Sequence, residues 1–170
     1  SSTSETTTGN TITVMEDVKK TEKTDGTEGN DVKIVVDSVN ADTSETGKST
    51  VTIGEGADVD LTVKDSNLTT GGHGIDIGVN LEGKDENKGA NVDLTLDNTN
   101  INLTEKDNTA GIVARDHSKV EVTLKGENTI DGKEALEDAA QEAEAEKKEG
   151  KSSPNRNVEG IRVGGENAGD

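Results

Sequence analysis

Four segments of this chain align with one another without a gap, and this repeat constrains the fold more than any other feature. They are VKIVVDSVN (32–40), VDLTVKDSN (59–67), VDLTLDNTN (92–100) and VEVTLKGEN (120–128). In each segment the first, third and fifth positions are Val, Ile or Leu, and the ninth is Asn. Apolar residues at every second position are typical of a strand with one buried face. Self-similarity at this spacing indicates stacked structural repeats.

A second short apolar segment accompanies each of these strands. The segments are TITV (11–14), STVTIG (49–54), GIDIG (74–78), GIVA (111–114) and GIRV (160–163). The connections between first and second segments vary widely in length, which a solenoid tolerates because its loops leave from the flank. We expect the apolar positions of the first strands to point inward: Val32, Ile34, Val36, Val59, Leu61, Val63, Val92, Leu94, Leu96, Val120, Val122 and Leu124.

Two longer motifs carry a resemblance to a known architecture. GENTIDG (126–132) precedes a Gly-Ile strand, and LTLDNTNI (94–101) is followed by AGIVA (110–114). Over residues 11–163 the chain resembles the right-handed parallel β-helix of the pectate-lyase-like superfamily. More particularly, it resembles β-helical repeats of clostridial and other gut-bacterial surface or adhesin-type proteins. The resemblance implies an all-β, right-handed parallel β-helix, or β-solenoid, of about four coils.

The aligned asparagines predict a structural ladder at one corner of the coil. Side-chain amides in equivalent positions can hydrogen-bond to the same amide one coil above and below, which satisfies buried polar groups. Asn also tolerates the left-handed backbone of a sharp corner. The alternative is a set of ordinary exposed turn asparagines. The ladder residues are Asn40, Asn67, Asn100 and Asn128.

Outward positions repeat as well. The sixth position alternates in charge, through Asp37, Lys64, Asp97 and Lys125, so adjacent strands would place opposite charges side by side. The second position runs Lys33, Asp60, Asp93 and Glu121, and its acidic members form either a solvated face or a cation site. Thr62, Thr95 and Thr123 form a third column, but the charged columns beside it exclude an ice-binding surface.

Composition alone would suggest disorder, because only 26% of the residues are hydrophobic and none is aromatic. The regular repeat excludes that interpretation. The net charge of −18 disfavours nucleic acid and anionic membranes as partners. The absence of cysteine excludes disulfides and thiol chemistry, and no apolar run is long enough for a membrane span. The only methionine is Met15, so we expect a mature product or an excerpt of a longer chain.

Two segments depart from the strand pattern. Residues 133–150 are rich in helix formers and free of β-branched residues, and Gly150 suits a helix end, which predicts a helical insertion. Residues 1–10 are small and polar, and we expect a flexible lead-in there. The solenoid itself is expected to span residues 11–170.

The sequence GGHGIDIG (71–78) opens like a calcium-binding β-roll repeat, but it occurs once and its eighth residue is glycine. The solenoid register explains it better: two glycines turn the chain, Ile75 and Ile77 point inward, and Asp76 points outward. Two acidic loops, 24–31 and 82–89, lack the spacing of an EF-hand. In the second loop, Lys84 and Lys88 reduce the net negative charge. We therefore expect no metal site and no cofactor, with weak calcium binding left open.

No catalytic residues are expected. His73 and His117 are interpreted as surface turn residues without partners for catalysis. Arg115 and Arg162 follow equivalent strands and share a face, but no acid cluster is placed beside them by sequence spacing. Sugar binding would have to rely on polar groups or bridging cations, because the chain has no aromatic platform.

These observations favour a non-enzymatic structural β-solenoid of a bacterial cell-surface or secreted protein, serving as an adhesin shaft, stalk or filament subunit. The alternative is a polysaccharide-binding β-helix module, calcium-assisted or not. Expected partners are further coils of the same chain or end-to-end copies of it, since open strand edges invite pairing. An extracellular glycan or host surface is a further candidate, and the expected location is extracellular or on the cell surface.

Overall fold

The computed structural model describes residues 6–9, 11–21, 23–27, 29–105, 108–133 and 158–163 of the chain. Their strands form three parallel sheets. Sheet A holds β1 (Thr6–Thr8), β4 (Asn40–Asp42), β7 (Asn67–Thr70), β10 (Asn100–Leu103) and β13 (Thr129–Asp131). Sheet B holds β2 (Ile12–Val14), β5 (Val51–Gly54), β8 (Ile75–Val79), β11 (Thr109–Ala114) and β14 (Val158–Val163). Sheet C holds β3 (Val32–Asp37), β6 (Asp58–Lys64), β9 (Asn91–Asp97) and β12 (Lys119–Lys125).

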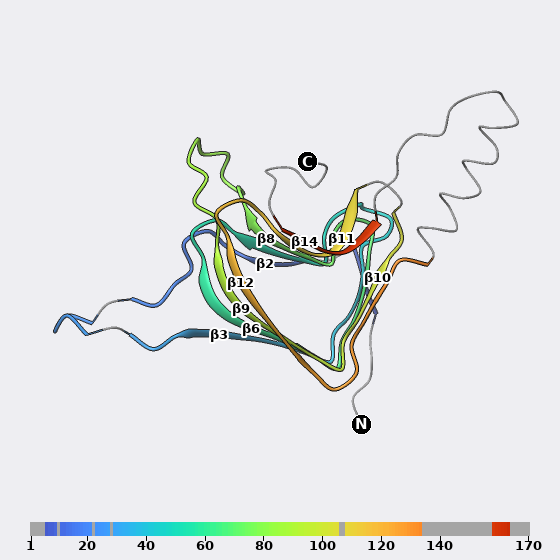
Figure 1. Ribbon diagram of the computed structural model, residues 1–170, viewed down its shortest axis with the longest axis horizontal. Coiled ribbons are helices and arrows are strands. Elements are labelled where there is room, and N and C mark those ends of the chain that lie inside the picture. The colour runs from blue at the N-terminus through green and yellow to red at the C-terminus, as the bar shows by residue number, and fades with distance from the viewer. Residues whose placement is uncertain are drawn as a thin grey trace, which may run out of the picture.

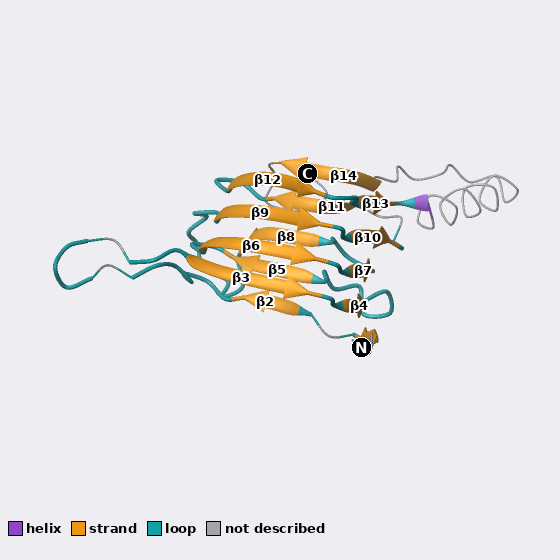
Figure 2. Cartoon of the chain, turned by 90° about the horizontal axis from the view of Figure 1, so that it is seen from below, coloured by secondary structure: helices purple, strands orange, loops and turns teal. Residues whose placement is uncertain are grey.

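The chain visits the three sheets in a fixed order, so each turn is one strand of sheet C, one of sheet A and one of sheet B. Strands β3 to β11 make three complete coils, with further strands before and after them. Seen down the coil axis, the sheets form a triangle (Figure 1). The chain runs counterclockwise in this view while the coils rise toward the viewer (Figure 2), so the β-solenoid is right-handed.

Columns of aliphatic side chains fill the interior. The register of sheet C pairs Val59 with Val92 and Leu61 with Leu94, so like residues stack on like residues. All four are at most 2% exposed. Because three sheets converge on a narrow triangle, Val, Ile and Leu fill the space without any aromatic ring. The inward direction predicted for these strands is confirmed in the central coils.

The outer coils are less covered. Val120 and Val122 of β12 are only half-buried, and Leu124 is 64% exposed although it pairs in register with the buried Leu96. Among the described strands β12 has β9 on one side and none on the other. Leu124 was expected to be an interior residue, and the missing neighbour explains why it is not.

Sheet A was not anticipated as a separate set of strands. The asparagines expected at a corner instead begin β4, β7 and β10. The residues that follow them, Ala41, Leu68 and Ile101, are buried and belong to the core. A signal was present, since these three asparagines are each followed by an apolar residue, but strands of three or four residues are too short to show a period.

The two unusual segments lie at the limits of the described chain. β1 lies within residues 1–10, where it pairs with β4, so sheet A begins inside the expected lead-in. The helical insertion expected at 133–150 lies outside the described residues from position 134 onward. In the described part, the structure contains no helix long and apolar enough to cross a membrane.

Candidate functional site

Three of the four predicted ladder asparagines lie in one column. Asn67 pairs in register with Asn40 on one side and with Asn100 on the other. The Asn67 amide donates to Asn40 Oδ1 at 3.4 Å. The next link skips Asn100, because Asn102 Nδ2 donates to Asn67 Oδ1 at 2.9 Å. The amide contacts of this column therefore include a residue that the repeat alignment did not mark.

Asn128 does not belong to this column. Thr129, not Asn128, pairs with Asn100, because the corner before β13 is one residue longer than the corresponding corner before β10. Asn128 instead closes the corner of the coil below: its Oδ1 accepts from the Thr99 backbone N–H at 2.9 Å, and its Nδ2 donates to Leu96 O at 3.3 Å. The gapless alignment was wrong at this position.

A buried polar stack fills the same corner. Ser66 Oγ accepts from the Val39 N–H at 3.1 Å, and Thr99 Oγ1 donates to Val63 O at 3.0 Å. Ser66 and Thr99 are 3% and 0% exposed. These hydroxyls satisfy backbone groups that the turn leaves unpaired, which would otherwise be costly to bury. The repeat pattern did not reveal these two residues, because the aligned asparagines that predicted the ladder follow them directly in the sequence.

The outward columns of sheet C have the predicted register. Asp37, Lys64 and Asp97 are successive partners, and Lys64 Nζ lies 3.5 Å from Asp37 Oδ2. In the acidic column, partial burial raises the pKa of Asp60, and the nearby carboxylates of Asp31 and Asp93 raise it further. Within the described residues no group of three acidic or histidine side chains is arranged to hold a metal ion.

The segment GGHGIDIG contributes one residue, Asp76, to an ion pair that is largely buried. Ile75 and Ile77 are fully buried, as predicted, but Asp76 is only 5% exposed although it faces away from the core. Arg115, at the end of β11, binds it with both ends of its guanidinium: Nε lies 2.8 Å from Oδ1 and Nη2 lies 2.9 Å from Oδ2. The hydrogen bonds to Asp76 raise the pKa of Arg115. Asp76 thus points outward, as expected, but Arg115 covers it and it is not exposed to solvent.

The structure also corrects the interpretation of His73. This side chain is 7% exposed, and its Nδ1 accepts a hydrogen bond from the Ala110 N–H at 3.1 Å. Nε2 therefore carries the proton of the neutral ring. Burial lowers the pKa of His73, and the cations of Arg115 and Arg162 add to that effect. His117 lies exposed in a turn with φ of 64°, as predicted.

We expect His73 to make the folded state sensitive to mild acid. Because its folded pKa lies below the unfolded value, the unfolded chain binds the proton more readily, and stability falls as pH decreases through about 6.5. Urea unfolding followed by circular dichroism at several pH values between about 7.5 and 5.5 should show this slope, with stability decreasing toward the acidic end of the range. His73→Gln should remove it, and His117→Gln should retain it. A slope that survives in His73→Gln would contradict the assignment.

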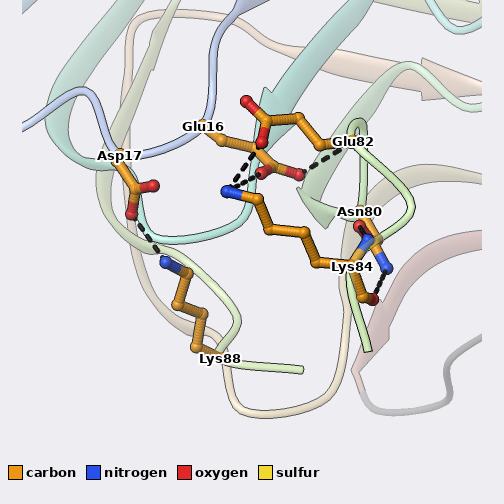
Figure 3. A network of polar contacts seen from close by, with 6 residues as sticks. All are labelled: Glu16, Asp17, Asn80, Glu82, Lys84 and Lys88. Carbon is orange, nitrogen blue, oxygen red and sulfur yellow. Dashed lines mark hydrogen bonds and ion pairs between the residues drawn. The ribbon is translucent and has the colours of Figure 1, made fainter. Parts of the chain in front are cut away.

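A loop between β8 and β9 is held against the segment that directly follows β2 (Figure 3). We call its fastening residues the clasp: Glu16, Asp17, Asn80, Glu82, Lys84 and Lys88. The Glu82 N–H donates to Glu16 Oε1 at 3.1 Å. Lys84 Nζ lies 2.6 Å from Glu82 Oε2 and 3.8 Å from Glu16 Oε2. Asn80 closes the loop on itself through two hydrogen bonds to the Lys84 backbone.

Lysine ammonium groups take the place of an external cation in this clasp. Lys88 Nζ lies 2.8 Å from Asp17 Oδ1, and this contact lowers the pKa of Asp17. The Glu16 side chain is 1% exposed, and its Oε2 accepts no hydrogen bond from the described residues but faces Lys84. In the other acidic loop Asp25 is engaged by its own turn, through Thr27 N–H at 3.0 Å. Asp25 in one acidic loop and Glu82 in the other are therefore engaged by groups of the protein itself.

A hollow of about 390 Å³ lies beside the clasp. Its lining consists of Glu55, Gly78, Val79, Asn80, Lys84, Asp85, Glu86, Asn87 and Arg115. Most of these groups are hydrogen-bond donors or acceptors, and the one large apolar side chain is Val79. Such a lining can bind hydroxyl or charged groups, but it offers no flat apolar surface for a sugar ring.

The fold and the site together define the class of protein: a right-handed parallel β-solenoid with a clasped loop and a polar hollow on one flank. Comparison with known proteins adds no family to this description. No family model, no curated protein and no solved structure matches the chain.

Proposed function

We propose that this protein is a non-enzymatic structural β-solenoid of a bacterial cell-surface or secreted protein, used as an adhesin shaft, stalk or filament subunit. The observation that carries the proposal is the uniform register of sheet C. Its outward columns repeat from β3 to β12 without interruption, and charge alternates along one of them. A surface that repeats in this way suits an elongated shaft or stalk, in which each coil adds the same length.

The state of the polar groups supports a structural role. A catalytic acid or base needs a side chain that can reach a substrate and exchange a proton. Asp76 and Arg115 instead satisfy each other with two hydrogen bonds, and His73 is buried against the backbone of Ala110. Lys84 is engaged by two carboxylates. The titratable side chains that could take part in catalysis are instead engaged in contacts that hold the coils and the clasp together.

The first test combines location and activity. Immunogold labelling of intact cells of the source organism should find the protein on the outside. Incubation of the purified chain with neutral and acidic polysaccharides should release no new chain ends, with or without calcium. Labelling only after lysis, or turnover of any polysaccharide, would overturn the proposal.

The polar hollow favours a second candidate, the polysaccharide-binding module. In that case glycan binding would saturate, and Glu86→Gln, in the lining, should weaken it. Glu45→Gln is the matched control, because Glu45 lies in an exposed turn outside the lining. Binding that requires calcium would assign it a bridging role. If both variants bind the glycan equally well, the hollow is not the glycan-binding site.

A further inference from the structure

Sheet C is one strand shorter than its neighbours. In the described chain sheets A and B contain five strands each, whereas sheet C contains four and is bounded by β3 and β12. Because each coil contributes one strand to each sheet, the position beyond β12 is the one that the next turn of sheet C would occupy. Among the described strands none occupies that position.

The free edge of β12 has the chemistry of an acceptor strand. An edge strand presents a row of unpaired backbone N–H and C=O groups that another strand can bind. On the inner face Val120 and Val122 are half-buried and Leu124 is exposed. On the outer face Glu121 and Lys125 are exposed. A further strand would cover the three apolar side chains and lie beside the two charges.

The register of the existing strands gives the rule for such a partner. Each strand of sheet C pairs with the next without any shift, from Val32 opposite Val59 to Val92 opposite Val120. In the sixth-position column, acidic and basic residues alternate in register, and Lys64 forms an ion pair with Asp37. By this rule the position beside Lys125 takes an acid. The second-position column does not alternate, because Asp60, Asp93 and Glu121 are successive acidic partners, and a base beside Glu121 would offset their repulsion.

One segment within the described chain satisfies every position of this rule. In β3, VKIVVD, the apolar residues Val32, Ile34 and Val36 would continue the inner columns. Lys33 would then lie beside Glu121, and Asp37 beside Lys125. Opposite charges on neighbouring strands stabilise pairing, whereas like charges in the same places destabilise it.

We propose that the β12 edge binds one extended, parallel strand of a partner polypeptide with this chemistry. The strand has apolar residues at its first, third and fifth positions, a basic residue at the second and an acidic residue at the sixth. The inference rests on the proposed structural function and names the kind of partner that would extend the solenoid.

A second folded copy fits this edge less well. When one copy is placed on another along the axis, β13 and β14 would meet β1 and β2 of the next copy. β12 and β3 would then remain separated by one strand position, since sheet C is one strand short. A single added strand fills that position directly.

Disulfide trapping can test the inference in the 170-residue chain, whose sequence contains no cysteine. Thr123 is the outward residue of β12 in the column of Thr62 and Thr95, and Val35 is the next member of that column in β3. A synthetic peptide of residues 30–42 with Val35→Cys is incubated in glutathione buffer with the Thr123→Cys protein. Adjacent strands bring the two Cα atoms about 5 Å apart, within disulfide range.

The matched control is the Thr62→Cys protein, whose strand has neighbours on both sides. We expect at least about tenfold more adduct, measured by mass spectrometry, with Thr123→Cys than with Thr62→Cys. A peptide carrying Lys33→Asp and Asp37→Lys should form about tenfold less adduct. Protein with Glu121→Lys and Lys125→Asp should reverse this preference, provided that circular dichroism shows it folded.

Equal trapping at the two protein positions would overturn the edge as the binding site. Equal trapping of the two peptides would overturn the charge rule. Neither result would bear on surface location or on the absence of polysaccharide turnover, so failure of this inference is distinguishable from failure of the proposed function.

Discussion

Gly74→Ala is expected to destabilise the folded protein by about 3 kcal/mol or more, whereas the same change at Gly160 should have little effect. A Cβ atom at position 74 would lie 2.4 Å from the carbonyl oxygen of Gly111 and 2.5 Å from Ile101 Cγ2. The carbonyl belongs to the neighbouring strand, so it cannot move without disturbing the ladder of sheet B.

Gly160 provides a control matched in position as well as in chemistry. The register of sheet B aligns Gly74 with Gly111 and Gly111 with Gly160, because Ile75 pairs with Ile112 and Ile112 with Ile161. A Cβ atom at position 160 would meet nothing within 4 Å. Urea unfolding followed by far-UV circular dichroism should show a lower midpoint for Gly74→Ala alone. Similar midpoints for both variants would show that the coils can separate enough to admit a methyl group.

Asp76→Asn is expected to cost about 3 kcal/mol of unfolding free energy, because it removes the carboxylate that binds the guanidinium of Arg115 through two hydrogen bonds. The Asp76 and Arg115 side chains are only 7% and 20% exposed, so water can replace the lost carboxylate only in part. The exposed pair of Asp37 and Lys64 is the comparison, and Asp37→Asn should cost less than about 1 kcal/mol.

A double-mutant cycle separates the ion pair from general packing. Asp76→Ala, Arg115→Ala and the double variant are unfolded in urea and compared with the parent chain. The double variant should lose less stability than the sum of the two single changes, since neither charge is then left alone. Strict additivity would mean that the two residues contribute independently, in spite of the bidentate contact.

Much of the fold could be predicted because sheet C shows a regular pattern in the sequence. Its strands span six or seven residues, enough for three apolar residues in alternation, as in Val59, Leu61 and Val63. The short strands of sheet A begin with a polar residue, which conceals them. The extra residue before Thr129 was missed because segments 92–100 and 120–128 are equally long and both end in Asn, so the alignment placed Asn128 opposite Asn100.

The polar contacts could not be predicted for a different reason. Asp76 is paired with a residue 39 positions later in the chain, and Glu82 donates to a carboxylate 66 positions earlier. Such contacts depend on how many residues each coil contains and on how loops fold back over the flank. Sequence spacing indicated neighbouring strands, but it did not show which outward side chains a loop would cover.

The alternating column of Asp37, Lys64, Asp97 and Lys125 has a consequence for how a gene encoding this solenoid could lengthen. Tandem duplication of a single coil would place two identical charges on neighbouring strands, where they repel. Duplication of two consecutive coils would preserve the alternation at the new junction. The column therefore favours growth of the gene by pairs of repeats, and it would penalise an odd number.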